Sequence, residues 1–312
     1  MGARSSSEYI DVMDNNCLHI RDWGEGKAIV FIPGWPFGHE MFEYQFMQLP
    51  QQGYRCIGIS MRGFGKSSKP WGEYNYSYDV FADDLQSVLL SLNLTNITLV
   101  GFSMGGAVAL RYMARHGGDK VANLVLCGAA APSFTIRADF PFGTEPGAVD
   151  KLIELCSSDR AALNGDFGTR FFKDSSSVTP QVIDWFQYLA MEASPHATAA
   201  CLATLRDSDL RKDMQSVNVP TVIFHGVHDR ICPFELAGTM TAPTETVPAL
   251  AKSMAVGAEA VAGGIAGATL IRFENSGHAL FYEESQKFNI ELVNFIEKKS
   301  SRVEKFFGPS TG

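Results

Sequence analysis

The 312-residue sequence contains no long uninterrupted apolar run. Its longest stretch rich in Ala, Gly and Val, residues 247–268, contains Lys252, Glu259 and several glycines, whereas a membrane-spanning helix needs about 20 predominantly apolar residues. The first residues lead directly to Glu8 and Asp11 without the apolar core of a signal peptide. We therefore expect a cytoplasmic protein without a membrane partner.

Paired cysteines are also missing. The sequence has no CxxC pair and no Cys/His cluster at zinc-ligand spacing, and its six cysteines are scattered: Cys17, Cys56, Cys127, Cys156, Cys201 and Cys232. Several lie in apolar runs, where a free thiol behaves as a small apolar side chain. The cysteines are therefore predicted to be reduced and buried, and no metal site is predicted.

The chain has no excess of positive charge. It carries 26 Lys and Arg against 34 Asp and Glu, a formal net charge of -8, and no basic run, so nucleic acid is not an expected partner. Residues 63–67, Gly-Phe-Gly-Lys-Ser, do not form a nucleotide-binding loop, because the two relevant motifs require glycine at Ser60 or at Ser68. No cofactor is predicted.

Apolar runs of strand length alternate with amphipathic segments of helix length. The runs are Ala28–Ile32, Cys56–Ser60, Ile97–Phe102 and Val121–Cys127, and the segments between them are His39–Leu49, Tyr78–Leu92 and Met104–Arg115. Strands without polar alternation are typical of a parallel sheet covered by helices on both faces. Before them, Tyr9–Met13 and Cys17–Trp23 alternate in polarity around Asp14-Asn15-Asn16, which predicts a hairpin.

The alternation stops between residues 131 and 215. This stretch has helix-like patches and no convincing strand, which predicts an inserted helical cap; the patches are Val149–Leu155, Val182–Leu189 and Ala199–Leu205. Later segments predict two strands and a closing helix, at Thr221–Phe224, Thr269–Phe273 and Glu284–Lys298. The expected fold is an α/β core of residues 1–130 and 216–312 with a cap of 131–215. A helix with frayed ends is expected within 241–267.

The pentapeptide Gly101-Phe102-Ser103-Met104-Gly105 matches the G-x-S-x-G nucleophile elbow, a sharp turn between a strand and a helix that exposes the serine oxygen. Such a string arises by chance in a glycine-rich chain, but here it follows an apolar strand and opens a helical segment, as the motif requires. Ser103 is therefore the predicted nucleophile.

A serine hydroxyl needs a base and an acid, and both are predicted at strand ends. His278 follows the last predicted strand and Asp229 follows the strand that ends at Phe224, so both belong to the edge of the sheet that carries Ser103. The order Ser, Asp, His is that of α/β-hydrolases. An acid after Val121–Cys127 is excluded because residues 128–132 contain no carboxylate. His19 and His116 do not share this strand-end position. The stronger alternatives to His278 as the base are His39, His196, His225 and His228.

Two backbone N–H groups are predicted to stabilise the negative charge that develops on a carbonyl oxygen during acyl transfer. Met104 provides one by its position after Ser103. Trp35, in the turn after the first apolar strand, provides the second, because the following Pro36 has no N–H.

These residues make the chain resemble the α/β-hydrolases, and among them the cofactor-free haloperoxidase, perhydrolase and arylesterase group. The resemblance runs from about Ile29 to Asp229 and resumes at Leu270; its most specific segments are Gly34-Trp35-Pro36, Arg62 to Ser67, Phe81 to Leu85, Gly101 to Gly106 and Val219 to Asp229. It implies a Ser103, Asp229 and His278 triad with Trp35 and Met104 as oxyanion donors. Two features depart from the family: Pro33 replaces a usual histidine, and the stretch from Asp229 to His278 is long.

The resemblance implies hydrolysis of small or medium esters or lactones, and in some members the use of hydrogen peroxide in place of water. Amidases and C–C hydrolases use the same kind of triad and oxyanion donors, so these activities stay open. The alternative to an enzyme is a protein that binds a ligand in the same pocket without turning it over. Small-molecule binding is expected under the cap, whose candidate apolar lining residues are Phe134, Phe140, Trp185, Phe186 and Leu189.

Overall fold

The computed structural model describes residues 7–174, 176–241 and 264–298. Their centre is one eight-stranded sheet with the order β1-β2-β4-β3-β5-β6-β7-β8. The strands are β1 Tyr9–Val12, β2 Asn16–Trp23, β3 Lys27–Ile32, β4 Tyr54–Ile59, β5 Ile97–Phe102, β6 Val121–Cys127, β7 Thr221–Gly226 and β8 Thr269–Phe273. All eight predicted strands are therefore present.

The sheet is antiparallel at one edge and parallel elsewhere. β1 and β2 form the predicted hairpin, with Asp14 and Asn15 at φ 61° and 55°, and β2 pairs antiparallel with β4. Asn and Asp tolerate this left-handed region better than most side chains, so the turn follows from the local sequence. The strands from β4 to β8 pair in parallel. Every residue of β4, β5 and β7 is buried, as expected for strands covered on both faces.

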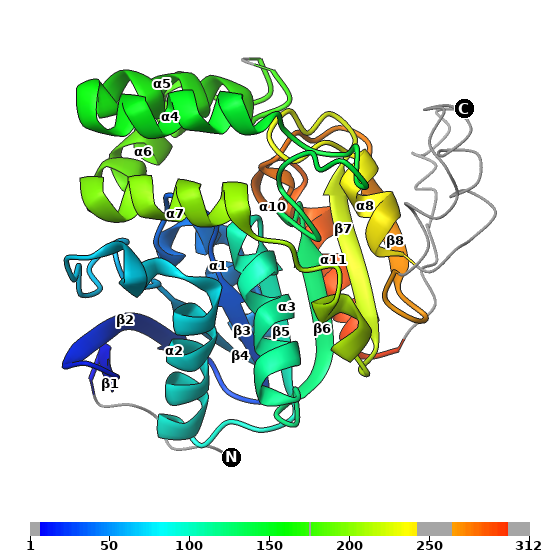
Figure 1. The fold of residues 1–312 in the computed structure, drawn as a ribbon. Coiled ribbons are helices and arrows are strands. Elements are labelled where there is room, and N and C mark those ends of the chain that lie inside the picture. The colour runs from blue at the N-terminus through cyan, green and yellow to red at the C-terminus, as the bar shows by residue number, and fades with distance from the viewer. Residues whose placement is uncertain (1–6, 175, 242–263, 299–312) are drawn as a thin grey trace, which may run out of the picture.

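Helices cover both faces of the sheet. Figure 1 shows α2 Tyr78–Ser91 and α3 Met104–His116 in front of the strands, and α1 Glu43–Gln48 and α11 Ser285–Ile296 behind them. The shorter helices are α8 Glu235–Met240, α10 Leu280–Glu283, η1 His39–Phe42, η2 Pro50–Gln52, η3 Glu73–Tyr76 and η4 Asp213–Ser216. The predicted segment 39–49 is thus a 3-10 turn followed by a short α-helix, and the closing helix is preceded by α10.

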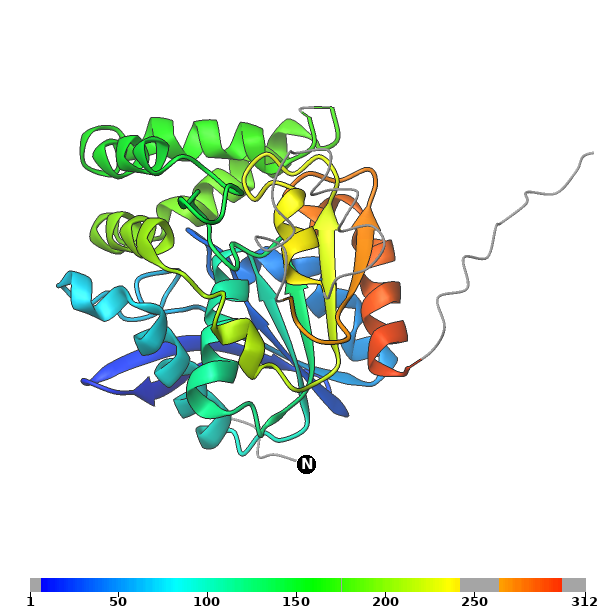
Figure 2. The same ribbon diagram turned by 45° about the vertical axis from the view of Figure 1, so that its right-hand side comes forward.

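Between β6 and β7 the described residues form four α-helices: α4 Pro146–Ser158, α5 Arg160–Phe171, α6 Pro180–Met191 and α7 Pro195–Asp207. Figures 1 and 2 show them gathered on the side of the sheet to which the carboxyl end of β7 points. Proline begins α4, α6 and α7, where its missing N–H costs no helical hydrogen bond. The helical character of this stretch agrees with the prediction, and the boundaries of a separate cap domain stay a prediction.

A buried ion pair fixes the loop after β4 against α2. The Arg62 guanidinium contacts both carboxylate oxygens of Asp84 at 2.6 and 2.7 Å, and each side chain is only 1% exposed. Arg62 also donates to Asn75 Oδ1. The planar guanidinium faces the carboxylate and makes this contact bidentate, so it holds a loop and a helix in one relative position.

The helix expected within 241–267 falls mostly outside the described residues, which leave out 242–263. None of the helices in the described part of the chain combines the length and apolar character that a membrane crossing demands.

Candidate active site

Ser103 lies at a strained turn between β5 and α3. Its φ of 52° and ψ of -119° are unfavourable for a residue with a side chain, and such conformations cost about 1–3 kcal/mol. The turn is tight enough that a Cβ on Gly101 would lie 2.5 Å from the Gly105 carbonyl oxygen. Glycine at both flanks therefore permits the elbow, as the sequence predicts.

The loop after β3 lies directly against this turn. A Cβ on Gly34 would lie 2.7 Å from the Cβ of Ser103, so only glycine allows this close approach. Trp35 follows at once, and its indole Nε1 donates to the Thr198 carbonyl oxygen of α7 at 3.0 Å. Within the described chain, neither the Trp35 N–H nor the Met104 N–H donates to another backbone carbonyl outside the regular helices and strands. Both donors are thus available beside Ser103.

His278 and Asp229 form a buried pair after β8 and β7. His278 Nδ1 lies 2.7 Å from Asp229 Oδ2, and the side chains are 1% and 0% exposed. The pair also approaches Ser103: the Phe102 ring packs against the His278 ring at 4.7 Å between centroids. A Cβ on Gly128 would lie 3.3 Å from His278 Nδ1, and the preceding residue, Cys127, accepts a hydrogen bond from the Ser103 N–H. The three predicted residues therefore converge on one edge of the sheet.

The surroundings of Asp229 keep it ionised. Burial alone would raise the pKa of this carboxyl, but the imidazoles of His278 and His225 outweigh burial and lower the pKa well below its usual range. The other carboxylate oxygen, Oδ1, accepts hydrogen bonds from the N–H groups of Ile231 and Cys232, both at 2.9 Å. Asp229 can therefore hold His278 with its proton on Nδ1.

The loop that carries His278 is held from two sides. Glu283 accepts from the Gly277 N–H and from the Lys173 N–H, both at 2.7 Å, and so ties this loop to the segment after α5. Phe171 at the end of α5 packs edge-on against the His278 ring at 5.6 Å. His278 Nε2 is buried and has no hydrogen-bond partner among the described residues. This nitrogen is therefore engaged by no described residue.

A pocket of about 70 Å³ opens beside Ser103 and reaches the helices of 131–215. Its lining includes three residues that the sequence singled out: Ser103, Trp35 and Phe134. Trp185 and Phe186 are not among its lining residues; Phe186 is 1% exposed and packs against Phe37, Phe171, Phe172 and other rings. Its remaining lining residues are Thr144, Leu152, Phe167, Arg170, Leu202, Leu205, Arg230 and Ile231.

Arg170 and Arg230 are pocket residues that the sequence analysis missed. An Arg170 Nη lies 2.7 Å from Asp166, and Arg230 donates to the carbonyl oxygens of Thr169 and Phe172. No carboxylate pairs with Arg230 in the part of the chain that the structure describes. No sequence signal marks these residues, because an arginine on a helix or after an aspartate is usually a surface residue.

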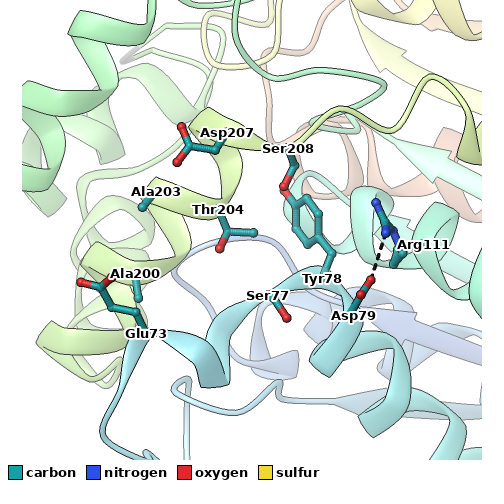
Figure 3. Close-up of a pocket in the computed structure, with 10 residues that line it drawn as sticks. All are labelled: Glu73, Ser77, Tyr78, Asp79, Arg111, Ala200, Ala203, Thr204, Asp207 and Ser208. Carbon is teal, nitrogen blue, oxygen red and sulfur yellow. Dashed lines mark hydrogen bonds and ion pairs between the residues drawn. The ribbon is translucent and has the colours of Figure 1, made fainter.

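A second pocket, of about 370 Å³, lies between the start of α2 and α7 (Figure 3). It contains none of the residues predicted to take part in catalysis. Its one arginine, Arg111, is already paired with Asp79 at 3.0 Å and with Asp213 at 2.7 Å. A pocket whose cation is neutralised in this way offers no strong site for an anionic ligand.

All six cysteines are free, as expected, and all but Cys17 are buried. Burial raises the pKa of Cys156 to about 11 and raises that of Cys127 well above its ordinary value, so both thiols stay protonated at neutral pH.

Comparison with known proteins gives consistent matches over nearly the whole chain. The alpha/beta hydrolase fold family matches residues 27–285. The AB hydrolase superfamily protein YisY of Bacillus subtilis (strain 168) is 42% identical over 287 residues, 92% of this chain and 98% of the relative. The non-heme chloroperoxidase CPO-A1 of Kitasatospora aureofaciens is 30% identical, over 90% of this chain and 96% of its own. The esterase structure from Exiguobacterium antarcticum has a TM-score of 0.81 and 38% identity, covering 95% of this chain and 100% of that one.

Proposed function

Since the chain belongs to the alpha/beta hydrolase fold family and resembles its non-heme haloperoxidases and esterases, we propose that it is a serine hydrolase of carboxylic esters. The observation that carries this proposal is the buried 2.7 Å contact between Asp229 and His278 beside the strained turn at Ser103. A serine, an oriented imidazole and a buried carboxylate together make a nucleophile, a base and a group that stabilises the imidazolium.

The proposed reaction has two steps. Ser103 Oγ attacks the ester carbonyl carbon while His278 Nε2 takes its proton, and the N–H groups of Trp35 and Met104 stabilise the oxyanion. His278 then gives the proton to the leaving alcohol, and an acyl group remains on Ser103. In the second step His278 activates water, which releases the carboxylic acid and restores the serine.

The pocket favours a small acyl group. Its volume of about 70 Å³ is well below the roughly 300–1,000 Å³ of pockets that hold larger ligands, so we expect an acetyl or propionyl group to suit it better than a long chain. Arg230, which meets no carboxylate among the described residues, adds positive charge to an otherwise mostly apolar lining, whereas the charge of Arg170 is offset by Asp166. We therefore propose that the enzyme prefers a short acyl ester and tolerates a carboxylate on the substrate.

Perhydrolysis is a second candidate, because the chain is 30% identical to a non-heme chloroperoxidase. In this reaction hydrogen peroxide replaces water in the second step and the product is a peroxyacid, with no change in the roles of the three residues. Lactones would follow the same steps, with the leaving alcohol kept on the acyl chain.

Active-site labelling and a substrate panel test the proposal together. We expect a fluorophosphonate probe to label Ser103 in the wild type and not in Ser103→Ala, and we expect esters of increasing acyl length to be hydrolysed progressively more slowly. Lactones, amides and C–C substrates in the same panel separate the related activities. If Ser103 is not labelled and no member of the panel is hydrolysed, the chain is a ligand-binding protein and the proposal is wrong.

A further inference from the structure

Three side chains with metal-binding atoms meet away from the Ser103 pocket. His19 lies on β2, whereas His39 and Glu40 begin η1. One ligand atom from each lies within 4.8 Å of those of the other two. Glu40 Oε1 is 3.5 Å from His19 Nδ1 and 3.7 Å from His39 Nε2. The structure thus brings His19 beside His39 and Glu40, two consecutive residues that lie about 20 positions later in the sequence.

Two imidazole nitrogens that lie nearest Glu40 Oε1 lack hydrogen bonds. His19 Nδ1 and His39 Nε2 are both buried and have no hydrogen-bond partner among the described residues. The side chains of His19 and His39 are 5% and 0% exposed, so water does not readily replace the missing partners. Buried polar atoms usually have partners, and two such nitrogens on one carboxylate oxygen indicate a group that they bind.

The other ring nitrogen of His39 has a partner of its own. His39 Nδ1 is 2.9 Å from Ser60 Oγ, which can accept its proton and leave the Nε2 lone pair directed at the cluster. Ligating histidines commonly have such a partner on the second nitrogen.

We propose that His19, His39 and Glu40 bind one divalent transition-metal ion, for which Zn²⁺ is the best match. Tetrahedral zinc with bonds of about 2.0–2.1 Å to nitrogen and oxygen separates its ligand atoms by about 3.4 Å. The two measured separations of 3.5 and 3.7 Å exceed this by a few tenths of an ångström. Three protein ligands leave a fourth position for water.

The position of the site indicates a structural role. A metal ion here joins β2, the second strand from one edge of the sheet, to η1, and η1 directly follows the loop that carries Trp35. Because the ion binds the folded chain and not the unfolded one, it raises the melting temperature in proportion to the logarithm of its concentration above Kd.

The test uses the full chain without a histidine tag, stripped with EDTA and titrated with Zn²⁺ in a calorimeter. We expect one equivalent to bind, the melting temperature to rise, and Co²⁺ in place of Zn²⁺ to give the visible absorption of a four- or five-coordinate ion. Glu40→Gln and His19→Gln should each weaken binding by at least about 100-fold, since loss of a ligand exceeds the 10–100-fold effect of an outer partner. His116→Gln is the matched control because His116 is a partly exposed histidine on α3 paired with Asp83, and its affinity should be unchanged.

Unchanged zinc affinity in both ligand variants, or a wild-type chain that binds no zinc in the calorimeter, would overturn the site. If circular dichroism shows that either variant is unfolded, Glu40→Asp takes its place, because it keeps the charge and withdraws the carboxylate by one methylene. Weaker zinc binding by folded Glu40→Asp supports the site, and wild-type affinity in that variant contradicts it. Ester hydrolysis by Ser103 is measured separately, so the two proposals fail independently.

Discussion

The hydrogen bonds around Asp229 make Asp229→Asn a direct test of how His278 is held. Oδ1 accepts from two backbone N–H groups, those of Ile231 and Cys232, and Oδ2 faces His278 Nδ1 at 2.7 Å. In asparagine only one of these positions is an oxygen. Placing the amide NH₂ toward two N–H donors would bury a repulsive contact, so the amide oxygen takes the Oδ1 position and the NH₂ faces His278.

His278 must then accept at Nδ1 and carry its proton on Nε2. This is the wrong tautomer for taking a proton from Ser103, and the imidazolium also loses its stabilising charge. The same substitution in other Ser-His-Asp enzymes lowers kcat by about 10⁴-fold, or about 5.5 kcal/mol in activation free energy. The pair is at most 1% exposed here, so water cannot easily substitute for the lost interaction and we expect a loss of that size.

The assay is the steady-state hydrolysis of p-nitrophenyl acetate, with the melting temperature recorded to establish folding. Asp83→Asn is the matched control, because Asp83 pairs with the exposed Arg115 at 2.7 Å on the outer side of α2 and α3, and kcat should stay within about twofold. A folded Asp229→Asn variant that retained a tenth of the wild-type kcat would refute the tautomer argument.

Three further predictions concern stability and specificity. Asp84→Asn leaves the buried Arg62 charge unpaired and should cost about 3–5 kcal/mol, or roughly 6–10 °C in melting temperature by calorimetry; a shift below 2 °C would contradict it. Because the pKa of Asp229 is lowered on folding, its ionisation stabilises the protein above the unfolded pKa of about 4 and less as pH falls below it. The difference in melting temperature between wild type and Asp229→Asn should therefore shrink below about pH 4, and a gap that is constant from pH 3 to 7 would argue against this linkage. Arg230→Gln should lower kcat/KM for a hemisuccinate ester relative to a neutral ester by about fivefold, a value discounted because the charge is exposed; equal effects on both esters would show that Arg230 does not determine this specificity.

The sequence predicted the strands and the elbow well because both depend on local patterns. Apolar runs of strand length indicate a sheet covered on both faces. The elbow at Ser103 depends on Gly101 and Gly105, which belong to the same five-residue motif. α5 Arg160–Phe171 was missed because Asn164, Gly165 and Gly168 lie within it, and their low helix propensity is overcome by packing such as that of Phe171 against Phe37.

Other parts of the site depend on contacts between distant segments, which local patterns do not report. Trp185 and Phe186 are apolar, and an apolar side chain suits a pocket wall and the interior between helices equally well; the structure packs Phe186 among other rings. Likewise His19 and His39 are 20 residues apart without a ligand motif, and their ring centroids lie 4.8 Å apart because β2 pairs with β4, against which η1 packs.

The replacement of the family's histidine by Pro33 can be understood from the same long-range contacts. The loop after β3 is held by its backbone: the Phe37 N–H donates to the Gly34 carbonyl oxygen at 2.9 Å, and Gly34 lies against Ser103. Trp35 is held in addition by its indole hydrogen bond to Thr198. None of these contacts uses the side chain of residue 33. Because the position of the Trp35 N–H depends on glycine packing and on α7, the support of the proposed oxyanion site does not require a histidine there.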